Sequence, residues 1–289
     1  MPEIMPEMIS LEEARELVLS RVEALPTETV PMLDAVGRAS AADLFSDIDV
    51  SPFAHAAMDG YALRAEEIAA ASEDAPVELD VIAEVAAGDW FEGAVEPGQC
   101  VRIMTGAPVP TDVDAVVKYE VVGIVSGDGK EGSRVSFASP AQVGSNIRAA
   151  GEEAKAGERI ISEGEVINAA GVGFAASCGI VEVSVHARPR VAIIATGSEL
   201  VDPTEVPTKG KIRNSNGYAI AACVQAAGGV PDILPAREDS LEGLKAAVSD
   251  AVRDHDFVIT TGGAANGDFD FIKHVVSDLG ELLMTTVNM

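Results

Sequence analysis

The sequence has few of the side chains that form disulfide frameworks and zinc sites. Its 289 residues include 3 cysteines and 4 histidines, scattered along the chain. None of them shows the paired spacing that a structural zinc site or a disulfide-rich scaffold requires. They are Cys100, Cys178, Cys223, His55, His186, His255 and His274. We therefore predict that neither a zinc centre nor a set of disulfides holds the fold together, and that the cysteines are buried as small apolar residues.

Positive charge is also scarce. The chain carries 20 Lys and Arg residues against 47 Asp and Glu residues, a formal net charge of −27, and no lysine precedes Lys118. Such a polyanion repels the phosphate backbone of DNA and RNA, which excludes nucleic acid as a partner. An acidic surface poor in lysine stays soluble in concentrated salt, where screening removes its self-repulsion. The composition is therefore halophilic-like and predicts a salt-rich cytoplasm.

Long apolar runs are missing as well. No stretch approaches the roughly 20 apolar residues that an α-helix needs to cross a bilayer. Residues 1–7 are acidic where a secretory signal would be basic. We therefore predict a cytoplasmic protein that has no membrane partner. The length and the 47% of hydrophobic residues suffice for about two or three globular domains.

The clearest pattern lies near the end of the chain, where short apolar runs alternate with amphipathic helices. Residues 191–196 and 257–261 are β-branched runs that each end in a threonine followed by a glycine. This pattern is typical of buried strands that lead into tight loops. A helix-capping residue, Ser240, lies between the two runs. Alternating strands and helices predict a parallel α/β sheet, in which ligands bind at the carboxyl ends of the strands.

Glycines and acids gather after these predicted strands. Backbone amides of a glycine loop can approach a phosphate closely, and the dipole of a following helix favours the anion. Carboxylates follow three of the strands, namely Glu199, Asp239 and the pair Asp268 and Asp270. These acids would repel a phosphate unless a divalent cation lay between them. The pattern therefore predicts a cation-assisted phosphate site at one edge of the sheet.

The rest of the chain predicts a different architecture. A capping box that begins at Ser10 starts a helix, which Pro26 should end. Several short alternating runs with glycine turns follow and predict a small β-rich domain. The fold class is thus α/β plus β, in several domains. The predicted domains are an elongated connecting domain (1–50 and 141–188), a β-rich domain (51–140) and an α/β domain (189–289).

Several segments, in order along the whole chain, resemble motifs of the molybdopterin molybdenumtransferases of molybdenum cofactor synthesis (MoeA and the E domain of gephyrin). No one segment is specific by itself, but the set is highly specific. The segments are Met58-Asp-Gly-Tyr-Ala62, Arg102-Ile-Met-Thr-Gly-Ala-Pro-Val-Pro110, Asn146-Ile-Arg148 with Gly151-Glu152, Arg188-Pro-Arg-Val191 with Thr196-Gly-Ser-Glu-Leu200, and Thr261-Gly-Gly263 with Gly267-Asp-Phe-Asp270.

The resemblance implies an enzyme of molybdenum cofactor biosynthesis. Such a transferase inserts molybdate into adenylylated molybdopterin and releases AMP, with Mg²⁺ as the cofactor. A molybdopterin adenylyltransferase would be the upstream partner. The resemblance also implies a homodimer whose site lies between the molybdopterin-binding α/β domain of one protomer and the β-rich domain of the other.

Matching positions imply the residues of the site. The catalytic acids and hydroxyl of the family fall on Asp59, Thr105, Glu199, Asp239 and Asp270. Of these, Glu199, Asp239 and Asp270 are the implied Mg²⁺ ligands. The implied substrate-binding residues are Thr196, Gly197, Ser198, Gly262, Gly263, Gly267 and Glu153. Ser198 stands where family members commonly have Asp, and Glu153 is a longer carboxylate than the usual one.

The family continues into a lysine-bearing loop and a C-terminal β-barrel past the point that corresponds to Met289. The resemblance therefore implies a C-terminally truncated chain with an incomplete α/β domain, which binds adenylylated molybdopterin but does not insert molybdenum. Two alternatives stay open. One is a molybdopterin adenylyltransferase, which uses a similar sheet but lacks the segments around Asp59 and Thr105. The other is a non-catalytic molybdopterin-binding or scaffold protein. The sequence fits tungstate as well as molybdate.

The acidic composition leads to a prediction about salt. Raising KCl from low to molar concentration should raise the melting temperature, because counter-ions screen the repulsion among the carboxylates. Circular dichroism melts at constant pH measure this, with a neutral osmolyte as the control. An unchanged melting temperature across the KCl series would show that self-repulsion does not limit stability.

Overall fold

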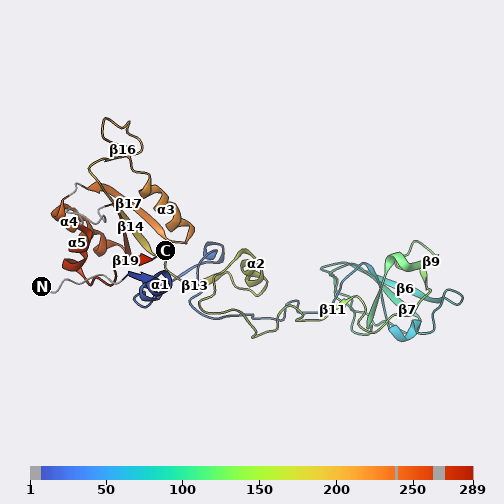
Figure 1. The fold of residues 1–289 in the computed structure, drawn as a ribbon. Coiled ribbons are helices and arrows are strands. Elements are labelled where there is room, and N and C mark those ends of the chain that lie inside the picture. Colours follow the sequence, from blue (N-terminus) through green and yellow to red (C-terminus); the bar gives the residue numbers. More distant parts are fainter. Residues whose placement is uncertain (1–7, 238–239, 263–270, 289) are drawn as a thin grey trace. The chain divides into compact units, whose positions relative to one another are not determined.

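The computed structural model describes residues 8–237, 240–262 and 271–288 (Figure 1). The chain folds into two compact units. Unit 1 comprises Met1–Ala41 and Val183–Met289, and unit 2 comprises Ala42–Glu182. In the described part of the chain, no helix is both long and apolar enough to cross a membrane. The finer division into three domains remains a prediction.

Unit 1 is built on a parallel sheet of three strands. β14 lies in the centre, between β17 and β18, and both neighbours run parallel to it. The strands are β14 (Arg190–Thr196), β17 (Val230–Arg237) and β18 (Phe257–Thr261). Residues 191–195 of β14 are all buried, as expected for a central strand that helices cover on both faces. The prediction of a parallel α/β sheet is confirmed.

Three helices cover the two faces of this sheet (Figure 1). They are α3 (Asn216–Ala226) on one face, and α4 (Leu241–Asp254) and α5 (Phe271–Leu279) on the other. Ala192 and Ile194 of β14 pack with residues of α4 and α5 in one apolar cluster. Because side chains alternate along a strand, Ile193 points to the face that α3 covers. Burying such an aliphatic side chain contributes about 1.5–3 kcal/mol.

Serine side chains start two of the helices, as predicted. The hydroxyl of Ser240 accepts a hydrogen bond from the Gly243 amide at 3.2 Å, at the start of α4. At the start of α1 (Leu11–Leu19), the hydroxyl of Ser10 accepts from the Glu13 amide at 3.2 Å. The Glu13 carboxylate accepts from the Ser10 amide at 2.8 Å in return. The capping box is therefore complete.

The end of α1 differs from the prediction. The helix stops at Leu19, well before Pro26. The hydroxyl of Ser20 donates to the carbonyl of Leu17 at 2.7 Å and replaces a helical hydrogen bond there. Val22, on the expected apolar face, is 56% exposed, so little packing would hold a further turn. The helix thus ends where its tertiary packing ends, before the chain reaches Pro26.

Small parallel and antiparallel pairs complete unit 1. β1 (Met8–Ser10) runs parallel to β19 (Thr286–Asn288), which joins segments near the two ends of the described chain. The other pairs are β2 (Thr27–Pro31) with β13 (Glu182–His186), and β15 (Leu200–Val201) with β16 (Ile212–Arg213). A 3₁₀ helix, η1 (Met32–Ala35), follows β2.

Unit 2 contains a six-stranded sheet in the order β8-β5-β7-β6-β10-β9. Its strands are β5 (Gly60–Leu63), β6 (Val77–Val85), β7 (Gln99–Ile103), β8 (Ala115–Lys118), β9 (Val122–Ser126) and β10 (Arg134–Phe137). β6 and β7 are parallel, and the other neighbours are antiparallel. Tyr61 and Leu63 enter one apolar cluster and Ala62 enters another, so both faces of the sheet are packed. The prediction of a β-rich region separate from the α/β sheet is confirmed.

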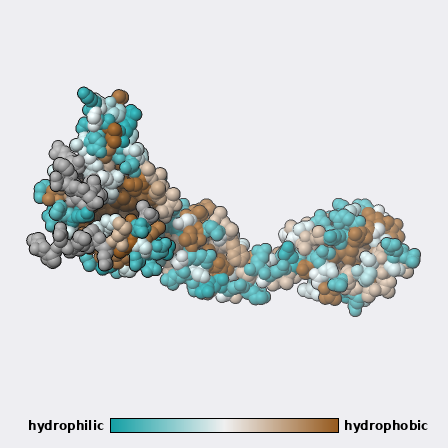
Figure 2. All heavy atoms as spheres, in the orientation of Figure 1, coloured by the Kyte–Doolittle hydropathy of each residue, from teal (hydrophilic) through white to brown (hydrophobic). Residues whose placement is uncertain are grey.

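Unit 2 also contains shorter elements. They are the pairs β4 (His55–Ala56) with β11 (Ile147–Arg148) and β3 (Leu44–Phe45) with β12 (Arg159–Ile161), the helix α2 (Ala169–Ser177), and the 3₁₀ helices η2 (Ala65–Ile68) and η3 (Tyr119–Val121). Figure 2 shows hydrophilic residues over much of the visible face of both units, as the acidic composition predicts.

The cysteines follow the prediction in part. All three are free, and Cys100 and Cys178 are buried. Burial raises the pKa of the Cys100 thiol to about 12, which keeps it protonated and unreactive. The prediction is wrong for Cys223, which is exposed on α3. Helical periodicity places that side chain away from the sheet, and composition alone does not show which face a residue occupies.

Close packing at Gly60 gives a stability prediction. A Cβ atom on Gly60 would lie 2.1 Å from the Val117 carbonyl oxygen on the neighbouring strand. Gly60→Ala should therefore lower the free energy of unfolding by about 3 kcal/mol, measured by urea denaturation. Gly173→Ala is the matched control, because a Cβ atom there meets nothing within 4 Å in helix α2. A Gly60→Ala protein as stable as the wild type would contradict this packing.

Candidate functional site

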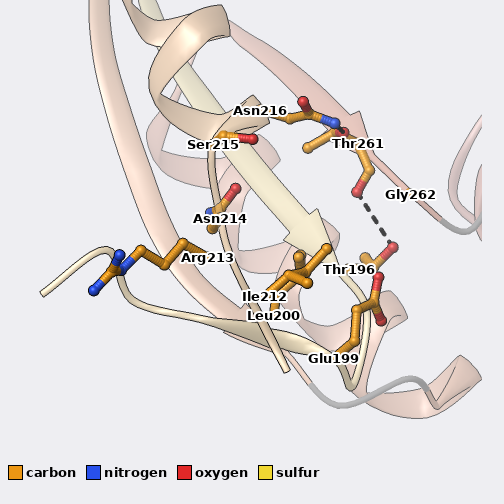
Figure 3. A pocket seen from close by; sticks show the side chains of 10 residues that line it. All are labelled: Thr196, Glu199, Leu200, Ile212, Arg213, Asn214, Ser215, Asn216, Thr261 and Gly262. Carbon is orange, nitrogen blue, oxygen red and sulfur yellow. Dashed lines mark hydrogen bonds between the residues drawn. The ribbon is translucent and has the colours of Figure 1, made fainter. Parts of the chain in front are cut away.

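A polar cavity lies at the carboxyl edge of the unit 1 sheet, where β14 and β18 end. Its volume is about 130 Å³. It is lined by Thr196, Glu199, Leu200, Ile212, Arg213, Asn214, Ser215, Asn216, Thr261 and Gly262. Figure 3 shows these residues around the ends of the two strands. The sequence placed a ligand site at this edge, and of the predicted residues the cavity brings together Thr196, Glu199 and Gly262.

Glycine permits the close approach of the two strand ends. Gly262 has a φ of +88°, and a Cβ atom there would lie 2.3 Å from the Thr196 carbonyl oxygen. Gly197 has a φ of +150°, and a Cβ atom there would lie 2.6 Å from the Glu199 carboxylate. A side chain at Gly262 would push the two strand ends apart, whereas one at Gly197 would displace the Glu199 side chain. These turns therefore keep their backbone amides accessible to a ligand.

Neutral donors and acceptors form the rest of the cavity wall. The Thr196 hydroxyl donates to the Thr261 carbonyl, and the Asn216 amide donates to the Thr261 hydroxyl, both at 3.4 Å. The Asn214 side chain accepts from the Gly217 amide at 3.0 Å and caps α3. The amino end of α3 is thus one boundary of the cavity, and its dipole favours an anion.

Sequence reasoning missed the polar residues before α3. Among these residues, the Asn214 side chain caps α3. The position of this polar run was the signal for a ligand site. The run lies after a glycine loop and at the start of a helix, in a parallel α/β unit. Thr261 was quoted as part of a motif without a role of its own.

Charges of both signs lie beside the cavity. The ammonium group of Lys211 donates a hydrogen bond to the Ser198 carbonyl, and the Arg213 Nε donates to the Glu205 carbonyl at 3.0 Å. Figure 3 shows Arg213 extending away from the strand ends, whereas Glu199 lies next to Thr196. The exposed Glu199 carboxylate and the Thr196 hydroxyl supply hard oxygen donors of the kind that Mg²⁺ binds.

The predicted metal site is only partly within the described residues. Asp239, Asp270, Gly263 and Gly267 lie outside them. In residues 8–237, 240–262 and 271–288, no group of three or more His, Cys, Asp or Glu side chains could hold a metal ion. Glu199 is the one predicted Mg²⁺ ligand whose position is known, so the three-carboxylate site stays a prediction.

In unit 2, the structure brings Asp59 and Thr105 into direct contact. The Asp59 Oδ1 accepts a hydrogen bond from the Thr105 hydroxyl at 2.7 Å and another from the Thr105 amide at 2.8 Å. These two bonds, and the charge of Arg102, hold the pKa of the Asp59 carboxyl below its ordinary value. Asp59 precedes β5 and Thr105 follows β7, which are neighbouring antiparallel strands. Strand pairing therefore creates a charged acceptor with a hydroxyl donor beside it.

Glu153 lies apart from this pair. Residues 50–57 and 146–154 run side by side as two paired segments. Glu153 lies at one end of this pair of segments, where its amide donates to the Val50 carbonyl at 3.1 Å. Ala57, near Asp59, is at the other end and donates to the Asn146 carbonyl. The neighbouring Glu152 forms an ion pair with Arg148 at 2.8 Å. The structure therefore does not place Glu153 beside Asp59 within the same unit.

The fold and the cavity define a class of protein. A parallel sheet with glycine turns and a helix amino end at its carboxyl edge is an α/β phosphate- or nucleotide-binding domain. Two family descriptions match the sequence. The MoeA N-terminal region (domain I and II) matches residues 9–179, and a probable molybdopterin binding domain matches residues 192–288. The chain belongs to the MoeA family.

Relatives agree with this assignment. A molybdopterin molybdenumtransferase of Bacillus subtilis is 37% identical over 282 residues, and one of Staphylococcus aureus is 34% identical over 282 residues. Each alignment covers 97% of this chain, but 65% and 66% of the respective relative. The solved MoeA structure from Pyrococcus horikoshii has a TM-score of 0.79 at 34% identity, and the match covers 89% of this chain and 67% of that one. The chain thus spans about 65–66% of the length of these curated relatives.

The Asp59–Thr105 contact predicts a measurable pKa change. Thr105→Val removes the hydroxyl donor and keeps the shape, so the pKa of Asp59 should rise toward its ordinary value. Because the folded-state pKa is depressed, this bond stabilises the fold above the unfolded-state pKa, and the benefit is lost as pH falls through the folded-state value. Carboxyl ¹³C NMR titration measures the shift, with Thr111→Val as the control. An identical titration in wild type and Thr105→Val would show that the hydroxyl does not stabilise the carboxylate.

Proposed function

We propose that the protein works in the Mg²⁺-assisted insertion of molybdate into adenylylated molybdopterin, a reaction that releases AMP. Membership of the MoeA family and the activity named for its relatives support this. The observation that carries the proposal is the Asp59–Thr105 contact, which orients a carboxylate of unit 2 through two hydrogen bonds to its Oδ1. A domain that only bound a pterin would not need that group.

In this reaction, a water molecule attacks the adenylate phosphorus and loses a proton, and its oxygen becomes part of the released AMP. Asp59 accepts that proton. Thr105 engages only Oδ1 of the carboxylate among the described contacts, so Oδ2 is available to the nucleophile. The Thr105 hydroxyl fixes the orientation of the carboxylate, and the bond that breaks is the one between the AMP phosphorus and the oxygen of the molybdopterin phosphate.

The cavity of unit 1 holds the anionic part of the substrate in this proposal. Amides of the turns at Gly197 and Gly262 and the amino end of α3 face the phosphates. Lys211, anchored on the Ser198 carbonyl, places a positive charge next to the first of these turns. Glu199, with Asp239 and Asp270, would hold Mg²⁺, which neutralises charge on the leaving phosphate when it is bound.

The proposal extends to partners. In this proposal the protein is a homodimer, and its site lies between the α/β domain of one protomer and the β-rich domain of the other, as the family resemblance implies. Adenylylated molybdopterin would come from a molybdopterin adenylyltransferase. The acidic composition, with a net charge of −27, fits a salt-rich cytoplasm as the place of this reaction.

Asp59→Asn tests the proposed function. It keeps the shape of the side chain and removes the proton acceptor, so AMP release should slow by on the order of 10³-fold. Single-turnover assays with adenylylated molybdopterin, molybdate and Mg²⁺ measure the rate. Asp80→Asn is the matched control, because Asp80 is an exposed carboxylate in the same sheet that pairs with Arg134. Wild-type rates in Asp59→Asn would overturn the assignment of Asp59 as the acceptor.

A further inference from the structure

Arg102 is held on several sides within unit 2. It lies on β7, and its side chain is 17% exposed. Its Nη1 donates to the Gly129 carbonyl at 3.1 Å, and its guanidinium carbon lies 4.7 Å from the centre of the Tyr119 ring. Its Nε lies 3.2 Å from the Glu84 carboxylate, across the β6–β7 pair. Together these contacts fix a planar cation in one orientation.

The charge of Arg102 is only partly neutralised by its neighbours. The Nε–H is buried without a hydrogen-bond partner, so the contact with Glu84 is an ion pair rather than an aligned hydrogen bond. Glu84 also faces the ammonium group of Lys130 at 3.9 Å and is thus shared between two cations. A shared, poorly aligned counter-ion leaves positive potential around Arg102.

Arg102 is linked to the Asp59–Thr105 pair by two routes. Along its own strand, β7 leads directly into Thr105. Through its stacking contact it holds Tyr119, whose amide donates to the Asp59 carbonyl at 3.1 Å. Tyr61 reinforces the arrangement, because its hydroxyl donates at 2.8 Å to the same Gly129 carbonyl that Arg102 binds. The backbone on both sides of the pair is therefore tied to one guanidinium group.

We propose that Arg102 is a positioning residue, which fixes the Asp59–Thr105 pair through Tyr119 and places a positive charge near that pair. Its own contacts with Gly129, Glu84 and Tyr119 leave it little access to a substrate, so it acts through Asp59. This inference rests on the proposed role of Asp59 but has a readout that does not depend on turnover.

Other charged groups near Asp59 do not duplicate this effect. Lys118 ends β8 opposite Gly60, and Glu120 follows it in η3, so their charges oppose each other. Tyr61 is buried, which raises the pKa of its hydroxyl and keeps it neutral. Among the charges of the surrounding elements, that of Arg102 is the one that lowers the pKa of Asp59, after the two bonds from Thr105.

The test compares Arg102→Met, Arg102→Lys and a control, Arg134→Met. Arg134 lies on β10 in the same sheet and pairs with Glu78 and Asp80 at the surface. Carboxyl ¹³C NMR titration of the 289-residue chain reports the pKa of Asp59, and amide hydrogen exchange reports the Tyr119 bond. Arg102→Met should raise that pKa and speed Tyr119 exchange. Arg102→Lys should keep the pKa close to wild type but still speed exchange, because an ammonium group cannot stack and bond as a guanidinium does.

Glu84→Gln provides an independent arm if Arg102→Met does not fold. Removing the shared counter-ion should lower the pKa of Asp59 further, since more of the positive charge of Arg102 then reaches it. An Asp59 titration that is the same in wild type, Arg102→Met and Glu84→Gln would overturn the proposal. A shift of equal size in Arg134→Met would also overturn it. Normal AMP release by Asp59→Asn would instead refute the proposed function, and the two failures are therefore distinguishable.

Discussion

The two strand ends of unit 1 come closer than side chains would allow. At Gly262 there is no room for a Cβ atom beside the Thr196 carbonyl, and the backbone has a positive φ. The cavity depends on this approach, because it brings the ends of β14 and β18 to the same wall as the amino end of α3. A side chain at this position would separate the strands and fill the space that a phosphate would occupy.

This arrangement also explains how so acidic a chain can offer a place to an anion. The net charge of −27 would repel a phosphate or an oxyanion at most points of the surface. Besides the charged residues Glu199 and Arg213, the cavity wall presents hydroxyl and amide groups, backbone amides and a helix dipole, none of which carries a formal charge. Lys211 adds a cation at the glycine turn, anchored on the Ser198 carbonyl. The local dipoles act on an anion at short range. The carboxylates elsewhere on the surface are more distant, and salt screens their repulsion.

In unit 2, the candidate functional group is the Asp59 carboxylate, and different interactions hold it in place. Asp59 is exposed to solvent. Its carboxyl group therefore needs no special solvent environment to be ionised. Its charge is fixed by two donors from one residue and by the field of a guanidinium group that is itself held by a stacked ring and a carbonyl. The six-stranded sheet therefore orients the side chain of the proposed proton acceptor, which lies at its surface.

The sequence by itself determined the class of the fold. Apolar runs that end in threonine and glycine defined β14 and β18, and serine capping residues defined the starts of α1 and α4, because strand burial and helix capping are local properties. Family motifs supplied Asp59 and Thr105 as candidates, but no local rule could show that they touch. That contact depends on the pairing of β5 with β7, residues that are far apart along the chain.

Other features were decided only by tertiary structure. α1 ends at Leu19 rather than before Pro26, because packing fails before the proline is reached. Cys223 is exposed because of the face of α3 that it occupies. Arg102 lies within a family motif and Asn216 within a polar run, but the sequence does not show which groups surround either residue. Their roles arise from the groups that surround them, and only the folded chain brings those groups together.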